Sequence, residues 1–504
     1  MNQMIVWAIW VPLAGAVLTF LIRSRHVRTI GLAASVLTAL IANLVVWNVW
    51  REGAQRYALG GWGAPLGIDL LADGLSVFML VMTAGVGVLV SWYAWGYFQP
   101  ADHTSTDAKH SGRVGWAEPD SFWPTWLLLW AALNIIFLTS DMFNAYVGLE
   151  IMSLAAVALV LLSRERIALT AGLRYLLASL MGSLSYLLGV AMLYAAFGTL
   201  DMTLLGERIE PGWPAWTSLG LVTAGLMLKS ALFPLHFWLP PAHANAPTPV
   251  SAILSALVIK ASFYLVLRLW FEVFHDVKTQ GASEFVGAIG AIAILWGSAQ
   301  AIRQQRLKLL VAYSTVAQVG YLFLMIPLAT PSPEIAPGPL ELNVFGWDGG
   351  MYQVISHAFA KAAMFLAAGT IIYALSDVDK IDDMAGFASR IPITTSAFAL
   401  ASVSLMGLPP SGGFVAKWLF MTASIQNRQW WWSAVLIVGG LLTAIYVFKV
   451  LAKAFRPAPE GRSWQHVPLT MELPALALAL VAFLMGIFAA TVYQLLEIGR
   501  GPFQ

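Results

Sequence analysis

Residues 225–250 read GLMLKSALFPLHFWLPPAHANAPTPV, and this stretch decides the fold. It starts as an apolar helix, carries Lys229 inside the apolar run and breaks at Pro234. Proline removes a backbone donor and interrupts a helix, and a charge inside a hydrophobic segment is costly. A lysine beside a helix break therefore predicts a polar site inside an otherwise apolar bundle.

The composition predicts a membrane protein. The chain has 504 residues, of which 59% are hydrophobic and 11% are charged, against about 25% charged in soluble proteins. Apolar runs of about 20 residues, long enough to cross a bilayer, recur from end to end. We predict an all-α polytopic membrane protein that forms one integral membrane domain over residues 1–504. The absence of cysteine excludes cysteine-ligated clusters within the chain, and no basic run indicates nucleic acid as a partner.

About fourteen apolar segments are predicted to span the bilayer. We group them as three peripheral helices within 1–95, two five-helix repeats at 122–271 and 284–452, and a last helix at 471–495. The polar segment 98–121 between the third and fourth spans is long and is a candidate partner contact. The predicted spans are 4–22, 29–49, 73–95, 122–140, 142–162, 168–197, 216–233, 248–271, 284–301, 308–329, 349–375, 393–424, 430–452 and 471–495.

The loop charges predict the orientation of the chain. Sixteen Lys and Arg residues lie in or beside the loops after spans 1, 3, 5, 9, 11 and 13, and six lie on the opposite side. Because basic loops stay on the cytoplasmic side, we expect both termini outside, in the inner (plasma) membrane of the cell. An even number of spans also requires both termini to lie on one side, in agreement with this orientation.

Several ionisable residues lie inside predicted spans. The acid deep in a span is Glu150, and His357 lies four residues before a lysine. Each intramembrane charge costs at least about 2.5–3.5 kcal/mol, so a functional reason is expected. Two of the arginines are near span ends, where their side chains are expected to reach the interface. The basic residues inside spans are Arg174, Lys229, Lys260, Arg268, Lys361 and Lys417.

A second interrupted span matches the first. The twelfth span reads SLMGLPPSGGFVAKWLF and breaks at Pro409 and Pro410 before Lys417. Each broken span is the fourth of its five-helix repeat, and an odd repeat length makes consecutive repeats inverted. Such a pair indicates a transport site, and a lysine whose protonation responds to a nearby acid is suited to relay protons. His236 and His243 flank the first break and are candidate gates, although capping the loop is the favoured interpretation.

Five segments of the chain are distinctive: GLEIMSL, LKSALFPLHFWLPPAHANAPTPVSA, LLVAYSTVAQVGYL, ISHAFAKAAMFLAAG and LMGLPPSGGFVAKW. In this order they resemble the antiporter-like proton-conducting membrane subunit family, and the resemblance covers about Asp73 to Lys453. This family includes Mrp-type sodium/proton antiporter subunits and the proton-pumping membrane subunits of complex I, with relatives in membrane-bound hydrogenases and inorganic-carbon uptake complexes.

The resemblance implies a role for each buried residue. Glu150 is implied to pair with Lys229, and Lys260 to bridge the two halves. His357 and Lys361 are implied to continue the proton path to Lys417 at its far end. The combination of Glu150 with Lys417 resembles the D-type component of Mrp, although one complex I subunit combines the same residue types.

The resulting hypothesis is a proton-translocating subunit of a multi-subunit Na⁺/H⁺ antiporter. Its expected partners are other membrane subunits, the lipid bilayer, protons and Na⁺. The alternatives are a proton-pumping subunit of a complex I-like NADH-quinone oxidoreductase or hydrogenase, or of an inorganic-carbon uptake complex. We expect no cofactor and no metal site in this chain, which is then not an enzyme by itself.

Overall fold

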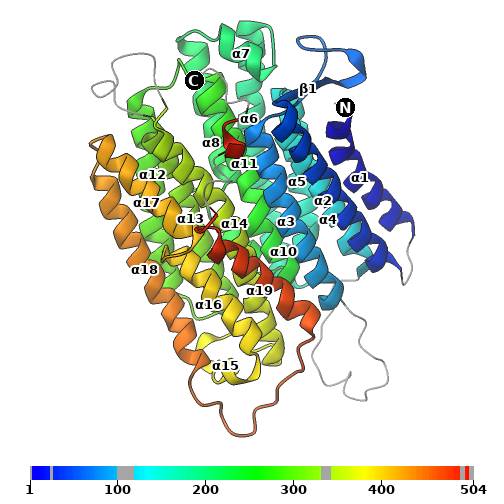
Figure 1. Ribbon diagram of the computed structural model, residues 1–504, viewed down its shortest axis with the longest axis vertical. Helices are drawn as coiled ribbons and strands as arrows, with labels where there is room; N and C mark the ends of the chain where they lie inside the picture. Colours follow the sequence, from blue (N-terminus) through cyan, green and yellow to red (C-terminus); the bar gives the residue numbers. More distant parts are fainter. Residues whose placement is uncertain (1–2, 23–25, 99–118, 331–341, 489–493, 499–504) are drawn as a thin grey trace.

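Long apolar runs fold here as helices because a helix satisfies its own backbone hydrogen bonds where water is absent. The computed structural model describes residues 3–22, 26–98, 119–330, 342–488 and 494–498, so most of the polar segment 98–121 lies outside the described residues. The helices run side by side along the long axis of the molecule (Figure 1). A two-stranded antiparallel hairpin stands at one end of the bundle.

The first half of the chain contains α1 to η4. In order, the elements are α1 (Met4–Leu21), α2 (Val27–Glu52), β1 (Gln55–Ala58), η1 (Leu59–Gly61), β2 (Asp69–Ala72), α3 (Gly74–Tyr97), α4 (Pro119–Leu138), α5 (Met142–Leu161), α6 (Arg166–Phe197), α7 (Met202–Arg208), α8 (Trp213–Lys229), α9 (Leu239–Asn245), α10 (Thr248–Ile253), the π-helix η3 (Leu254–Val258), α11 (Ile259–Arg268) and the π-helix η4 (Leu269–Val273).

The second half contains a further interrupted span, between α16 and α17. Its elements are α12 (Gln280–Arg303), α13 (Leu307–Ala329), α14 (Val344–Ala374), η5 (Ile381–Asp383), α15 (Phe387–Arg390), α16 (Pro392–Met406), α17 (Gly412–Gln426), α18 (Trp431–Ala454) and α19 (Leu469–Leu484).

Among the described residues, 11 helices are long and apolar enough to cross a membrane, and α16 and α19 are shorter apolar helices. The chain is therefore a polytopic helical membrane protein, while the count of fourteen spans stays a prediction. The last predicted span, 471–495, is too long, because α19 ends at Leu484. Gly486 follows two residues after this end, and glycine is a poor helix former. Its backbone lies so close to Pro410 that an added Cβ would be 2.0 Å from the Pro410 carbonyl oxygen.

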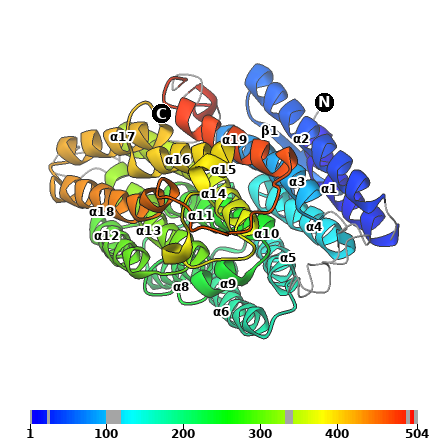
Figure 2. The same cartoon turned by 90° about the horizontal axis from the view of Figure 1, so that it is seen from below.

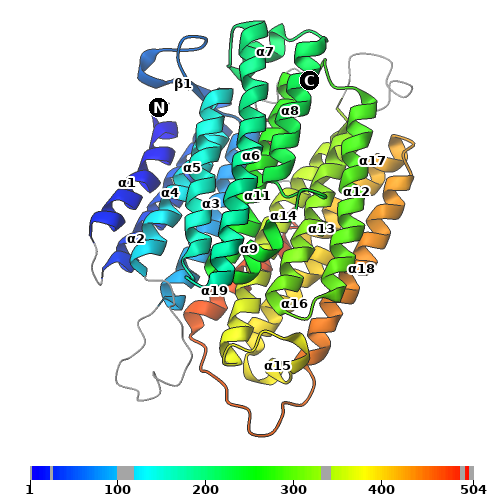
Figure 3. The same ribbon diagram turned by 180° about the vertical axis from the view of Figure 1, so that it is seen from behind.

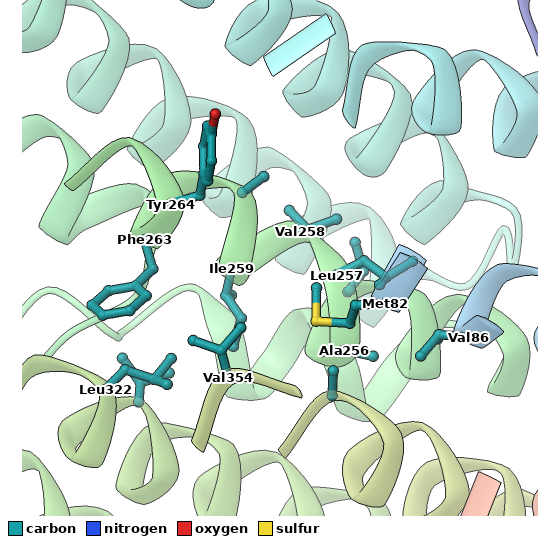
Figure 4. Close-up of a cluster of buried hydrophobic side chains, with 14 of the residues drawn as sticks. Met82, Val86, Ala256, Leu257, Val258, Ile259, Phe263, Tyr264, Leu322 and Val354 are labelled. Atoms are coloured by element: carbon teal, nitrogen blue, oxygen red, sulfur yellow. The ribbon is translucent and has the colours of Figure 1, made fainter. Parts of the chain in front are cut away.

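The segment from Thr248 to Val273 occupies the centre of the bundle. Its apolar stretch is fully buried. It packs against α3 and α14, with α13 beside it (Figures 2 and 4). Figure 4 shows Met82 of α3, Leu322 of α13 and Val354 of α14 grouped around it. The helices α1 and α2 lie at one side of the molecule and α17 and α18 at the other (Figure 2). Any path across the molecule therefore passes this central segment.

Ion pairs connect separate segments of the chain at both ends of the bundle. At the hairpin end, Arg56 contacts Asp69 at 2.8 Å and Asp201 at 2.5 Å. At the other end, Arg306 contacts Asp379 at 2.5 Å and Lys453 contacts Asp382 at 2.8 Å. The aspartates after α14 therefore hold loops and helices together.

The first helix and the last described segment lie at the hairpin end. Three successive helices alternate in direction from α1 to α3, so α1 begins at the end where the hairpin stands (Figure 1). The backbone N–H of Gly74 donates to the Ile498 carbonyl at 2.7 Å, which places residues 494–498 beside β2. Which of the two faces is outside stays a prediction.

The interpretation of Arg268 as an interfacial side chain is wrong. Arg268 is buried, and its guanidinium contacts the Asp73 carboxylate at 2.5 Å. Asp73 caps α3, where its side chain accepts from the Ser76 N–H. Glu472 is buried as well, and it accepts from Thr394 at the start of α16. Glu150 is thus not the only carboxylate inside the described bundle, and Asp73 and Glu472 are more deeply buried.

Two glycines let α6 and α8 approach closely. A Cβ added at Gly225 would lie 2.4 Å from the Gly182 carbonyl oxygen, and one added at Gly182 would lie 2.8 Å from that of Gly225. Small residues permit such contacts between membrane helices. The close approach places Lys229 at the end of α8 against the side of α6.

We expect Gly225→Ala to separate α6 from α8, since backbone atoms oppose the added methyl. Overpacking of this kind costs about 1–3 kcal/mol. The measurement is the thermal unfolding midpoint of the purified protein in detergent. Gly220→Ala in the same helix is the matched control, because no atom lies within 4 Å of its added Cβ. Equal midpoints for the two variants would contradict the close packing.

Candidate functional site

Glu150 and Lys229 form an ion pair between three helices. The Lys229 Nζ lies 3.7 Å from Glu150 Oε1. It donates to Ser153 Oγ of α5 at 2.8 Å and to Ser179 Oγ of α6 at 2.9 Å. Ser183 of α6 donates to the Glu150 carboxylate. The lysine is buried, whereas the Glu150 side chain is 21% exposed, so the pair connects the interior of the bundle with its lateral surface.

The helix α8 ends at Lys229. The Trp238 indole donates to the Leu228 carbonyl at 2.9 Å, which satisfies one oxygen released at the end of α8. The peptide bond before Pro234 is cis, and the helix resumes at α9. Figure 3 shows α6, α8, α9 and α12 together on the face opposite to that of Figure 1.

The two histidines at the break lie in different surroundings. His236 accepts from the Trp296 indole at 3.2 Å near the outer face of α12. His243 is fully buried in α9, and its Nδ1 lies 3.3 Å from the Ser251 carbonyl, so it holds the α9–α10 turn. Its ring also stacks on Phe365 with a centroid distance of 5.4 Å. His243 therefore reaches the centre of the bundle, and His236 does not.

Lys260 and Lys361 lie in the centre of the bundle, each bound to backbone oxygen. Lys260 follows the π-helix η3, and its Nζ donates to the Ser255 carbonyl at 2.5 Å. Irregular turns of this kind are frequent at functional sites. Lys361 on α14 donates to the Val311 carbonyl and to Ser314 Oγ of α13, both at 2.6 Å. The two lysines act on each other electrostatically.

His357 lies one turn before Lys361 on α14. Both ring nitrogens are buried, and neither has a hydrogen-bond partner among the described residues. Lys260 and Lys361 both act on the imidazole electrostatically. A buried polar group without a partner requires an explanation, and receiving or passing a proton is one.

Two glutamines lie between His357 and Lys417. Gln353 lies one turn before the histidine on α14, and its Nε2 donates to Gln318 Oε1 of α13 at 2.9 Å. The Gln318 Nε2 donates to the Leu405 carbonyl at 3.4 Å. Leu405 O also accepts from Lys417 Nζ at 3.2 Å. One carbonyl oxygen is thus shared between the central groups and the last lysine.

Lys417 lies in α17, and its ammonium contacts the C-terminal end of α16. Its Nζ donates to the Met406 carbonyl at 2.8 Å and lies 4.8 Å from the centre of the Tyr321 ring. Gly407 has φ +80°, and a Cβ there would lie 2.5 Å from Lys417 Cδ, so only glycine leaves room for the lysine. The ammonium borders a cavity of about 290 Å³ between α17 and α18 whose wall includes the exposed Trp418.

The structure thus places the six predicted proton-transfer residues in two groups within the bundle. Glu150 pairs with Lys229, and Lys260, Lys361 and His357 lie together at the centre, where Gln353, Gln318 and the Leu405 carbonyl lead to Lys417. We refer to the two groups together as the line. The helix breaks at Pro234 and at Pro409 and Pro410 lie next to Lys229 and Lys417 in the chain. Sequence reasoning missed the polar groups between the lysines, because neutral serines and glutamines are common in any helix. These groups are Ser153, Ser179, Ser183, Ser255, Ser314, Gln318 and Gln353.

We expect the glutamine pair to behave as one unit in stability measurements. Gln353→Leu leaves the Gln318 amide without its partner, which costs about 1–3 kcal/mol, whereas replacing both glutamines removes the unsatisfied group. Thermal unfolding of the two single variants and the double variant measures the coupling. Gln280→Leu at the exposed start of α12 is the control. Additive losses in the double variant would contradict the direct contact.

Two family models match this chain. Residues 139–443 match the transmembrane model of the NADH:quinone oxidoreductase/Mrp antiporter family. Residues 63–105 match the N-terminal model of chain 5 of NADH-ubiquinone oxidoreductase (complex I). The first match contains the whole line from Glu150 to Lys417.

Curated relatives cover nearly the whole chain. The N-type component of the NADH-quinone oxidoreductase of Desulforudis audaxviator is 35% identical over 473 residues, which is 90% of this chain and 88% of that protein. The D-type component of the Na⁺/H⁺ antiporter of Bacillus subtilis is 28% identical over 504 residues, which is 97% of this chain and 94% of that protein. Both are named as subunits of larger assemblies.

Two solved structures share the fold. A chain of the Mrp complex from a Dietzia species has a TM-score of 0.85 at 23% identity and covers 98% of this chain, with 96% of that chain matched. A chain of the membrane-bound sulfane sulfur reductase, an archaeal respiratory membrane complex, has a TM-score of 0.85 at 24% identity, with 99% of both chains matched. With the family model and the relative at 35% identity, these likenesses lead to one conclusion: the chain belongs to the NADH:quinone oxidoreductase/Mrp antiporter family of membrane subunits.

Proposed function

We propose that this chain is the proton-translocating subunit of a multi-subunit Na⁺/H⁺ antiporter. The observation that carries the proposal is the line from Glu150 to Lys417. In this line the ammonium group of each lysine contacts an oxygen atom of the protein and can leave that oxygen when it loses its proton. Intramembrane ionisable groups that face the bundle interior mark ion pathways. The relatives named as D-type antiporter components, such as that of Bacillus subtilis, match nearly the full length of both chains.

The proton moves along the line in steps between neighbouring groups. Glu150 at the lateral surface sets the charge of Lys229, because removing or adding the carboxylate charge 3.7 Å away changes how well the ammonium is stabilised. Lys260 receives the proton at the centre, and His357 and Lys361 on α14 pass it towards α17. Lys417 is the terminal group. Because these sites interact, they titrate as a set.

The proposal includes the domain arrangement and the orientation. Residues 122–271 and 284–452 form two inverted repeats, with helices 1–3 within 1–95 and the last helix at the periphery. Lys229 and Lys417 then occupy equivalent broken helices, in accordance with inverted-repeat transporters. The hairpin end, where α1 begins and residues 494–498 lie, faces outside, and the end with Arg306 and Lys453 faces the cytoplasm.

A redox-driven pump is the second candidate function. The relative from Desulforudis audaxviator, named as a component of NADH-quinone oxidoreductase, has the higher identity of the two relatives, 35%. In that assembly the same line would be driven by electron transfer in other chains. Tagging this chain in native membranes and identifying its co-purifying proteins by mass spectrometry separates the candidates. Small membrane subunits without redox proteins support the antiporter, and flavin or iron–sulfur subunits overturn it.

We expect Glu150→Gln or Lys229→Ala to abolish cation-dependent proton transport in membrane vesicles. Each substitution removes one charge of the pair, so the remaining charge is no longer switched by its partner. The measurement is the collapse of an imposed pH gradient after Na⁺ is added. Glu165→Gln, at the exposed turn before α6, is the control. Wild-type transport by either variant in an assembled complex removes the central claim.

A further inference from the structure

A stripe of polar side chains runs along the central helix from Lys260 towards the hairpin end. Lys260, Tyr264, Arg268 and Glu272 recur at four-residue intervals through α11 and η4. Residues four positions apart lie on the same face of a helix. This face therefore joins the centre of the buried line to the end of the bundle near the hairpin.

The upper part of the stripe is one connected cluster. The Arg268 guanidinium donates to both oxygens of Asp73, at 2.6 and 2.5 Å, and to the Glu272 carboxylate. Its Nε donates to Tyr264 Oη at 2.9 Å. Tyr264 Oη in turn donates to the Phe137 carbonyl at 2.8 Å. Two helices that are distant in sequence, α3 and α11, meet in this cluster.

The charges of the cluster do not balance. One guanidinium faces two carboxylates, and arginine keeps its proton under all conditions relevant here. A buried carboxylate in excess of its positive partners is costly, and a proton bound to it cancels the excess charge. The cluster therefore has one carboxylate more than its guanidinium balances, and a proton taken up from the solution would neutralise it.

The two carboxylate side chains differ in how much of their surface is exposed. The Glu272 side chain is 30% exposed, and that of Asp73 is 6% exposed. Glu272 is thus the outer member of the pair, and Asp73 is the inner one.

The charged neighbours of Glu272 come from several elements. Arg268 and Asp73 act on its carboxylate electrostatically, and Tyr264 lies two turns below it. The helix α7 packs on η4 and carries Glu207 and Arg208, both exposed. Two further groups lie nearby on their own segments: His275, which contacts the Glu272 backbone carbonyl and Asp276, and Glu497, which is exposed in the segment packed on Gly74.

We propose that the cluster of Asp73, Arg268 and Glu272 is a proton-transfer site that connects Lys260 with the solution at the hairpin end. This inference rests on the proposed proton translocation and adds a branch to it. Uptake forms an O–H bond on Glu272 and breaks one in hydronium.

The proton then leaves Glu272 for Asp73, whose carboxylate shares the Arg268 Nη1 donor with Glu272. It continues through the Ser76 hydroxyl, which lies 2.9 Å from Asp73 Oδ1 and 3.5 Å from Tyr264 Oη. Ser76 and Tyr264 each release their own proton as they receive one, and the proton released by Tyr264 forms an N–H bond on neutral Lys260, one turn along α11. Arg268 orients both carboxylates and the phenol without losing a proton.

The test compares Glu272→Gln with Asp276→Asn in the assembled complex. Asp276 is a neighbouring carboxylate whose side chain is 69% exposed and lies outside the stripe. Transport is measured in vesicles while the pH on each side is varied separately. Glu272→Gln is expected to slow transport about tenfold or more, the scale on which a positioned proton donor acts. It is also expected to weaken the pH dependence on the hairpin side alone, while Asp276→Asn behaves as wild type.

The outcomes distinguish this inference from the proposed function. Wild-type rate and pH dependence in Glu272→Gln, with transport abolished in Glu150→Gln, overturn the branch and leave the main line intact. Wild-type transport in Glu150→Gln overturns the proposed function itself.

Tyr264→Phe decides the matter if Glu272→Gln does not assemble. This variant keeps the ring in contact with Phe137, whose centroid lies 5.3 Å away, and removes only the hydroxyl. Slower transport with the change in pH dependence confined to the hairpin side supports the branch. Wild-type transport in Tyr264→Phe overturns it.

Discussion

A lysine in a hydrophobic bundle has to be held by oxygen atoms of the protein, and the rest of the structure depends on this constraint. Only Lys229 of the four lysines in the line has a carboxylate within ion-pair distance among the described residues. Lys260, Lys361 and Lys417 are held by backbone carbonyls. A carbonyl is a weaker partner for an ammonium than a carboxylate, so it stabilises the charge without fixing it. The line can therefore hold a proton at each lysine and still release it.

Regular helices offer few carbonyls for this purpose, because each oxygen already accepts from the N–H four residues later. Irregular segments supply them for Lys260 and Lys417, whereas Lys361 contacts the Val311 carbonyl within α13. The end of α16 leaves the carbonyls of Leu405 and Met406 to Lys417, and the negative end of the helix dipole also favours a cation there. Lys229 is itself the last residue of α8. In one broken span the lysine precedes the break and in the other it follows it, yet both lie beside the C-terminal end of a half-helix.

The sequence predicts those features that a single segment carries. Apolar length locates most of the helices, although α19 ends well before residue 495, and prolines locate both breaks: Pro234 marks the first, and Pro409 with Pro410 marks the second. It does not predict contacts between distant segments: Arg268 looks like an interfacial residue until α3 brings in Asp73, 195 positions away. The same reason hides Gln318 and Gln353, which have meaning only through each other and through Leu405. The residue type alone thus identifies the lysines as functional candidates. The polar groups between the lysines can be identified only from the packing of the helices.

The two ends of the line explain why such a chain works as part of a larger assembly. Glu150 is partly exposed on the side of the bundle, and Lys417 borders a lateral cavity between α17 and α18. A charge that approaches the hydrocarbon region from inside the protein is expensive unless another polar group faces it. A neighbouring membrane protein at either side would provide that group and exclude lipid from the pair. Relatives of this chain are named as subunits of larger complexes, and the lateral position of these two residues gives a physical reason why isolation would be costly.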